Sequence, residues 1–123
     1  QANGCEYCLA AHSTIGKMVG LTADQILDSR RGTSVESKSA AIVQFARQVL
    51  DKQGRLSDAD LADARVAGLD DAAIAEVVGN VALNIFTNYF NHVAATDIDF
   101  PKAEPIVDHH EVCATIPGCD ETR

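Results

Sequence analysis

A long segment of helical periodicity in the second half of the chain most constrains the fold. Between residues 70 and 95, apolar side chains recur at the three- and four-residue spacing of an α-helix. A second face of the same segment carries Leu83, Phe86 and Phe90. A helix that is apolar on more than one side is either central in a core or shared with another subunit. We therefore expect one long helix against which the others pack.

The preceding part of the chain is predicted to form shorter helices separated by turns. Capping residues and glycines bound each segment, and Asn3 is a plausible N-cap for the first. The expected helices span residues 6–18, 23–29 and 58–67, with a further one that follows Thr33 and runs to about residue 52; the capping boxes Thr22–Gln25 and Thr33–Glu36 open the second and third helices of the chain. No segment shows sustained period-two alternation, so the predicted fold class is all-α.

The chain leaves the last helix at Pro101. Residues 1–101 are therefore predicted to form one helical domain. Residues 102–123 contain Pro105, Pro117 and Gly118 without periodicity, and are predicted to form a C-terminal arm.

Composition excludes several classes of function. The chain has 123 residues and a net charge of −8, which argues against binding to nucleic acid or to an anionic membrane surface. It contains no run of eighteen apolar residues and no visible signal peptide. Four cysteines fit an intracellular, cytoplasmic protein with a redox or metal site better than a disulfide-rich secreted domain. Aromatic residues make up only 5%, so we expect an aliphatic, alanine-rich core.

The most chemically informative residues are Cys5, Cys8 and His12, within the stretch QANGCEYCLAAHSTIG. On a helix, positions i, i+3 and i+7 share one face, so the three side chains form a stripe. The first turn of a helix carries unpaired N–H groups and the positive end of the helix dipole, which both favour a thiolate. A dithiol that cycles to a disulfide is the most specific interpretation of this motif.

Other interpretations stay open at this point. The C-x2-C-x3-H spacing could supply three zinc ligands, because zinc binds thiolate and imidazole. Candidates for a second ligand group lie in the tail: His109, His110, Cys113 and Cys119. A structural disulfide or two buried free cysteines would also fit the pair.

Polar residues interleave with the apolar ones on the long helix. Asn84, Asn88 and His92 step by four and so line one edge. Their side chains could satisfy one another and nearby helix ends inside a bundle or an oligomer interface. Alternatively, Asn88 and His92 approach the thiol site and help to bind substrate.

Three stretches of the sequence carry a family resemblance. The motif NGCEYCLAAH resembles the active site of the carboxymuconolactone decarboxylase superfamily on its alkylhydroperoxidase D side, and looks closest to the peroxidase-related branch. VALNIFTNYFNHVAATDIDFP and the intervening GRLSDADLADARVAGLDDAAIAEV are similar to the same branch. The likeness covers residues 3–101, most of the chain.

The resemblance implies an all-helical bundle that assembles as a homo-oligomer, a trimer or a hexamer. It also implies a thiol-dependent alkyl hydroperoxidase. Cys8 would attack the hydroperoxide, Cys5 would resolve the product as a disulfide, and His12 would belong to a proton relay. An external dithiol would reduce the disulfide, and no cofactor or metal is implied.

Several expectations qualify this picture. Tyr7, Asn88 and His92 are candidate pocket residues. The relay glutamate of the family precedes the first cysteine and cannot be placed in this sequence, so we expect that N-terminal helices are missing. A lactone decarboxylase is a second possibility, although decarboxylase members generally lack the cysteine pair. A third is a non-enzymatic oligomeric module that binds zinc or senses redox state.

Overall fold

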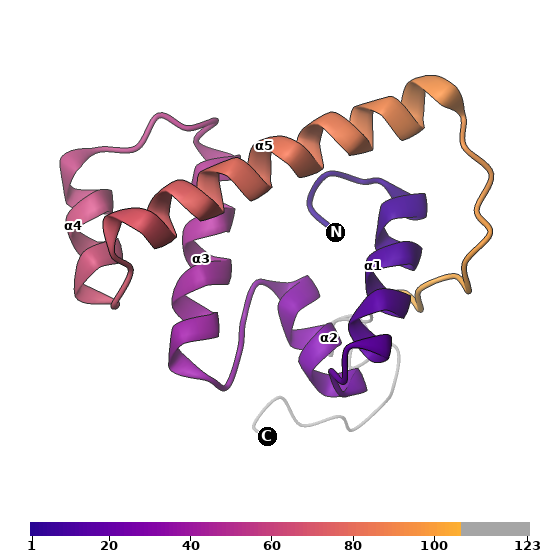
Figure 1. Ribbon diagram of the computed structural model, residues 1–123, viewed down its shortest axis with the longest axis horizontal. Coiled ribbons are helices and arrows are strands. Elements are labelled where there is room, and N and C mark those ends of the chain that lie inside the picture. Colours follow the sequence, from indigo (N-terminus) through magenta and orange to yellow (C-terminus); the bar gives the residue numbers. More distant parts are fainter. Residues whose placement is uncertain (107–123) are drawn as a thin grey trace, which may run out of the picture.

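The computed structural model describes residues 1–106, which form five α-helices and no strand (Figure 1). The helices are α1 (Glu6–Met18), α2 (Ala23–Arg31), α3 (Ser37–Asp51), α4 (Asp58–Val66) and α5 (Asp71–Ala94). The prediction of an all-α fold is confirmed for this part of the chain. Most of the predicted C-terminal arm, residues 107–123, lies outside the described residues.

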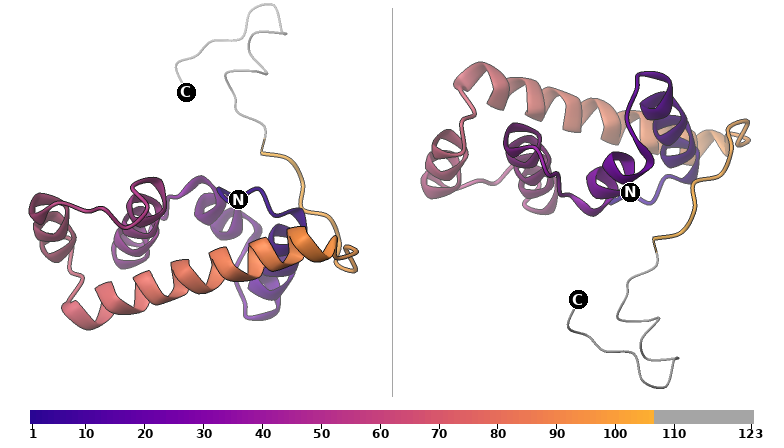
Figure 2. Two further views of the ribbon diagram at one scale, coloured as in Figure 1. Left: turned by 90° about the horizontal axis from the view of Figure 1, so that it is seen from above. Right: turned by 90° about the horizontal axis from the view of Figure 1, so that it is seen from below.

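The long helix α5 extends across the whole molecule (Figures 1 and 2). Its N-terminal half lies beside α3 and α4, and its C-terminal half reaches α1. After α5, residues 95–106 run in an extended course past α1. The helix therefore joins two parts of the fold, one built on α3 and α4 and the other on α1 and α2.

The hydrophobic core lies where α3, α4 and α5 meet. Its buried members are Ala41, Phe45, Val49, Ala64, Leu69 and Val77. Phe45 is the one aromatic side chain among them, in agreement with the expected aliphatic core. The small alanine side chains allow the helix backbones to approach closely. This core fixes the first half of α5.

Two helix starts agree with the predicted capping residues. Thr22 and Gln25 form the expected capping box at α2. Ser57 caps α4, and its partner in a second capping box is Asp60. In each box the two side chains satisfy N–H groups that have no partner within the helix.

The predicted N-caps of α1 and α3 were wrong. Cys5, rather than Asn3, caps α1, and the side chain of Asn3 is used elsewhere. Glu36, rather than Thr33, caps α3, because its carboxylate accepts hydrogen bonds from the backbone N–H groups of Lys38 and Ser39. The side chain of Ser39, followed by those backbone bonds, lowers the pKa of Glu36. The hydroxyl of Thr33 donates to Asp28 O instead, near the end of α2.

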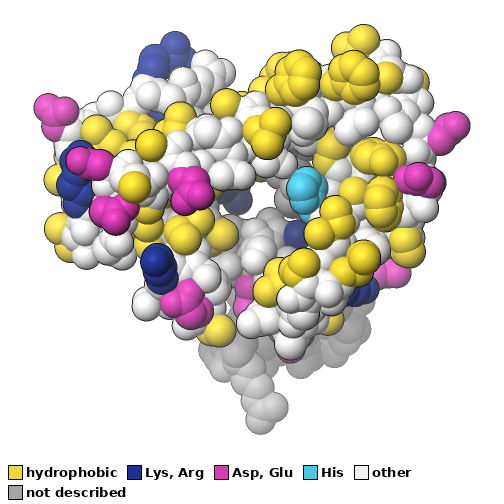
Figure 3. All heavy atoms as spheres, in the orientation of Figure 1, with side chains coloured by type: hydrophobic (Ala, Val, Ile, Leu, Met, Phe, Trp, Pro, Cys, Tyr) yellow, Lys and Arg dark blue, Asp and Glu magenta, His cyan; other side chains and the backbone are white. Residues whose placement is uncertain are grey.

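The second half of α5 exposes much of its apolar surface. Phe86, Phe90 and Val93 are 67%, 63% and 89% exposed, and Tyr89 is exposed as well. Hydrophobic side chains gather on the face shown in Figure 3, including the part over this end of the helix. The apolar period therefore predicted the helix correctly, but most apolar side chains of its second half stay exposed in the single chain. None of the helices in residues 1–106 is long and apolar enough to cross a membrane.

Candidate active site

Cys5 and Cys8 are joined by a disulfide at the start of α1, with their Cα atoms 5.3 Å apart. Both side chains are buried. Cys5 occupies the N-cap position, and its Sγ accepts the backbone N–H of Cys8 at 3.2 Å. The sulfur of Cys5 thus takes the place that a serine or aspartate oxygen fills in most N-caps. The pair lies at the positive end of the helix, as its spacing predicted.

A side chain of α5 reaches the second sulfur. The amide nitrogen of Asn91 donates a hydrogen bond to Cys8 Sγ at 3.3 Å. Asn91 was not among the predicted site residues, because the predicted polar edge of the helix follows steps of four, through Asn84, Asn88 and His92. The spacing that would have found it is Asn88 to Asn91, since positions i and i+3 also share a helix face.

Asn88 holds the segment just before the cysteines. It is 4% exposed, and its side-chain oxygen accepts a hydrogen bond from the amide of Asn3. Asn80 and Asn84, further back on α5, instead donate to backbone oxygens four residues earlier in the same helix. Asn88 and Asn91 therefore connect α5 with the segment that contains the cysteines, whereas Asn80 and Asn84 bond within their own helix.

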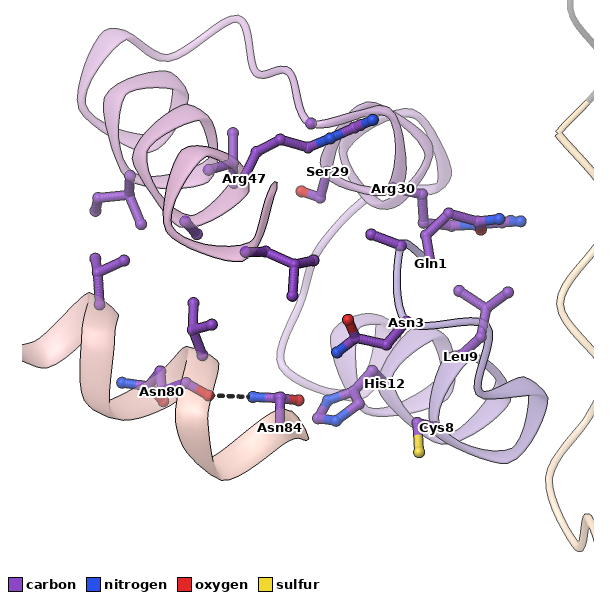
Figure 4. A pocket seen from close by; sticks show the side chains of 18 of the residues that line it. Gln1, Asn3, Cys8, Leu9, His12, Ser29, Arg30, Arg47, Asn80 and Asn84 are labelled. Carbon is purple, nitrogen blue, oxygen red and sulfur yellow. Dashed lines mark hydrogen bonds between the residues drawn. The ribbon is translucent and has the colours of Figure 1, made fainter. Parts of the chain in front are cut away.

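His12 lies one turn after Cys8 on α1 and is exposed to solvent. Figure 4 shows its imidazole beside the amide of Asn84, on the side of the pocket where Cys8 also lies. A base four residues after a thiol is on the same helix face and can exchange a proton with it, directly or through water. The structure thus brings the three residues of the sequence motif to one region.

A cavity of about 660 Å³ opens beside these residues, between α1, α2, α3 and α5. Its wall is mostly apolar and includes Leu9, Ile26, Ile42, Val77 and Val81. Cys5, Cys8, His12, Asn84 and Asn88 also line it. On the opposite side in Figure 4 lie Ser29, Arg30 and Arg47. The volume falls in the range of pockets that bind small organic molecules.

Two of the candidate pocket residues lie elsewhere. Tyr7 packs against Phe100 with ring centroids 5.7 Å apart and the rings nearly perpendicular. It holds the extended segment after α5 against α1 and is not among the residues that line the cavity. His92 is exposed near the end of α5 and does not line the cavity either. Their roles in substrate binding stay predictions.

A zinc site would need further ligands near the cysteine pair. Within residues 1–106, no group of three or more His, Cys, Asp or Glu side chains is arranged to hold a metal ion. The tail residues named for this role, His109, His110, Cys113 and Cys119, lie outside the described residues.

Comparison with known proteins supports the resemblance found in the motif. The profile of the carboxymuconolactone decarboxylase family matches residues 1–52, the part of the chain that contains α1, α2 and α3. The match includes both cysteines and His12, and it confirms the resemblance to this family. Comparison with curated proteins and with solved structures gave no match.

Proposed function

We propose that this protein, whose first 52 residues match the carboxymuconolactone decarboxylase family, reduces organic hydroperoxides with the Cys5–Cys8 pair. One observation carries the proposal: the two cysteines form a disulfide at a helix N-terminus, beside a cavity that His12 also lines. A dithiol in that position supplies a nucleophile and a second thiol that returns it to the disulfide. The family match by itself supports an enzyme of either type, peroxidase or decarboxylase.

The first step is the attack of the Cys8 thiolate on the distal oxygen of the hydroperoxide. A sulfur–oxygen bond forms, and the oxygen–oxygen bond breaks. Cys8 becomes a sulfenic acid, and the alkoxide leaves. The imidazole of His12 takes the proton from the Cys8 thiol before the attack and returns it to the alkoxide, so that an alcohol is released.

The second step uses Cys5. Its thiolate attacks the sulfur of the sulfenic acid, a disulfide forms, and the hydroxyl leaves with the thiol proton as water. The distance of 5.3 Å between the two Cα atoms lies within the range of protein disulfides. An external dithiol then reduces the bond by exchange and becomes a disulfide itself, which restores both thiols. A reducing compartment such as the cytoplasm supplies such dithiols.

The cavity supports a substrate larger than hydrogen peroxide. Its apolar side chains would bury an alkyl or aryl group, and its thiol and imidazole lie on one side, where the peroxide oxygens would have to bind. The hydroperoxide is therefore proposed to carry a hydrocarbon group.

We also propose that the protein assembles with further copies of itself as a trimer or hexamer. The support is the exposed apolar face at the end of α5, formed by Leu83, Phe86, Phe90 and Val93. Contiguous apolar surface of this kind marks interaction sites in soluble proteins. A homo-oligomer would cover it with the same face of another copy or with a different apolar surface.

The test is a thiol count in a variant that keeps only the proposed pair, Cys113→Ser/Cys119→Ser. The reduced protein is mixed with one equivalent of cumene hydroperoxide, and the products are mapped by mass spectrometry. We expect two thiols to be lost per peroxide, with a Cys5–Cys8 bond and one equivalent of cumyl alcohol.

Two further variants separate the roles of the cysteines. Cys8→Ser should lose no thiol to the peroxide. Cys5→Ser should consume one equivalent and stop at a sulfenic acid that a cyclic diketone traps on Cys8. Thiol loss at the same rate in Cys8→Ser would show that Cys8 is not the attacking residue. A parent variant that loses no thiol would overturn the peroxidase proposal.

A further inference from the structure

The two sulfur atoms of the pair have different hydrogen-bond donors. Cys5 Sγ, at the N-cap, accepts the backbone N–H of Cys8 at 3.2 Å. Cys8 Sγ accepts the side-chain N–H of Asn91, which comes from α5, at 3.3 Å. One donor therefore belongs to the helix that carries the cysteines, and the other comes from a residue 83 positions away.

The helix alone favours a negative charge on the wrong sulfur for the proposed reaction. A thiolate at the N-cap accepts backbone N–H groups directly and lies at the positive end of the helix dipole. Both effects act most strongly on Cys5, and they weaken within one turn. If nothing else acted, Cys5 would ionise first and Cys8 would stay a thiol. The proposed peroxidase needs the reverse order.

We infer that Asn91 selects Cys8, over the helix-capping Cys5, as the thiolate of the reduced pair. This inference rests on the proposed dithiol cycle. The amide N–H stabilises a negative sulfur more than a neutral one, because hydrogen bonds to charged groups are the stronger ones. Cys8 is buried, so water competes little for the same sulfur. The amide has no titratable proton, so it remains a donor at every pH at which the thiols titrate.

The surroundings of Asn91 hold this part of α5 in place. Its backbone oxygen accepts hydrogen bonds from the N–H groups of Ala95 and Thr96, so Asn91 lies in the last turn of α5. One turn earlier, Asn88 is bonded to Asn3, which fixes this part of α5 against the segment that leads into Cys5. The backbone that carries Asn91 is thus fixed next to the cysteine segment by a contact that involves neither sulfur.

The charged groups near the pair do not duplicate this role. His12, Arg30 and Arg47 line the same cavity as Cys8, from α1, α2 and α3. Glu76 of α5 and Gln1, which carries the N-terminal amino group, also line it. The guanidinium of Arg30 donates to the side chain of Gln1 and to the backbone oxygen of Glu104. Among these groups His12 alone is one turn from Cys8, and it acts in the proposal as the proton acceptor rather than as a fixed donor. Asn91 is the side chain that donates a hydrogen bond to the sulfur.

The test measures which thiol ionises, without any peroxide. Reduced protein is pulsed with iodoacetamide between pH 5 and 9, and alkylation of Cys5 and Cys8 is quantified separately by mass spectrometry. A thiolate displaces iodide and becomes a carbamidomethyl thioether, so the rate of each site follows its thiolate fraction. In the parent protein Cys8 should react first.

Asn91→Leu keeps the size of the side chain and removes the donor. We expect the ratio of Cys8 to Cys5 alkylation at pH 7 to fall about tenfold or more, since hydrogen bonds to charged groups contribute on the order of 1.5–3 kcal/mol. Asn91→Asp should lower the ratio further, because a carboxylate repels a thiolate. Thr87→Val is the matched control. It removes a hydrogen bond within α5 and should leave the ratio unchanged.

An unchanged ratio in Asn91→Leu would overturn the inference. If that variant does not fold, as judged by circular dichroism, Asn91→Ala and Asn91→Asp also remove the donor and provide the same comparison. The result is separable from the proposed function. A ratio that shifts in a protein that consumes no peroxide would refute the peroxidase and leave the selection of Cys8 standing. Peroxide consumption with an unshifted ratio would do the opposite.

Discussion

Asn3 and Asn88 are 85 positions apart in the chain, and their side-chain amides are hydrogen-bonded to each other. Asn88 is the buried polar residue of α5, at 4% exposure. A buried amide that loses its partner costs free energy, because neither water nor another protein group replaces the bond. This single pair fastens the loop before the disulfide to the helix that carries Asn91. It therefore affects stability and the geometry of the cysteines together.

A double-mutant cycle measures this bond. Asn3→Ala and Asn88→Ala should each lower the free energy of unfolding by about 1–3 kcal/mol. The double variant should cost less than the sum by about 1 kcal/mol, because the bond can be lost only once. The measurement is urea unfolding followed by circular dichroism, under reducing conditions. Additive losses would show that the pair contributes no coupling energy.

The N-cap role of Cys5 predicts a difference between two substitutions that remove the same thiol. Serine retains an oxygen that can accept the N–H of Cys8, whereas alanine has no acceptor. With a reductant present, Cys5→Ala should therefore be less stable than Cys5→Ser by about 0.5–2 kcal/mol. Urea unfolding of the two variants side by side provides the value. Equal stabilities would mean that the side chain at position 5 does not cap α1.

Asp60 predicts a pH dependence of stability. Each of its two carboxylate oxygens accepts a hydrogen bond from Lys52 Nζ at 2.7 Å. These bonds, followed by those from Ser57, lower the pKa of Asp60 from 3.8 to about 2. A pKa that is lower in the folded state means that the charged carboxylate stabilises the fold above pH 4. That contribution is lost as the pH falls from 4 towards 2.

The comparison of parent and Asp60→Asn tests this window. The parent should be more stable at pH 6, and the difference should vanish between pH 4 and 2 in urea unfolding. Lys52→Met removes the largest cause of the shift. In that background the substitution of Asp60 should have less effect, and its pH dependence should move towards pH 4. A difference that stays constant from pH 6 to 2 would contradict the assigned role of the ion pair.

Local signals in the sequence predicted the helices, because each signal acts over a few residues. The pair Thr22–Gln25 and the cap Ser57 mark helix starts through hydrogen bonds between residues three positions apart, and both are found in the structure. The N-cap of α1 was missed because asparagine is a far commoner cap than cysteine. In this fold Asn3 bonds to α5 instead, a competition that the local sequence does not reveal.

The parts of the site that come from α5 were harder to predict. The bond between Asn91 and Cys8 links residues 83 positions apart, and it depends on where the core of α3, α4 and α5 directs the end of the long helix. A helical period shows which residues share a face, but it does not show which half of the helix is covered. Nor does the period separate Asn88 from His92, which lie four positions apart on one edge, the first buried and the second exposed.

The exposed end of α5 gives the last prediction. If this apolar face is covered by another copy of the chain, Phe86→Ser and Phe90→Ser should weaken assembly, since each removes an aromatic side chain from the contact. Val66→Ser is the matched control. It is 90% exposed on α4, outside this face, and should leave the assembly intact. Light scattering coupled to size-exclusion chromatography would report the molar mass over a range of concentrations.

We expect the parent to elute with a mass of three or six chains, and the Phe86→Ser/Phe90→Ser variant to shift to smaller species. Because both side chains are more than half exposed in the single chain, the substitutions should leave its helix content unchanged. Circular dichroism of the variant checks this. A parent that is monomeric at all concentrations would refute self-association. An oligomer that the double substitution does not weaken would place the contact on another face of the molecule.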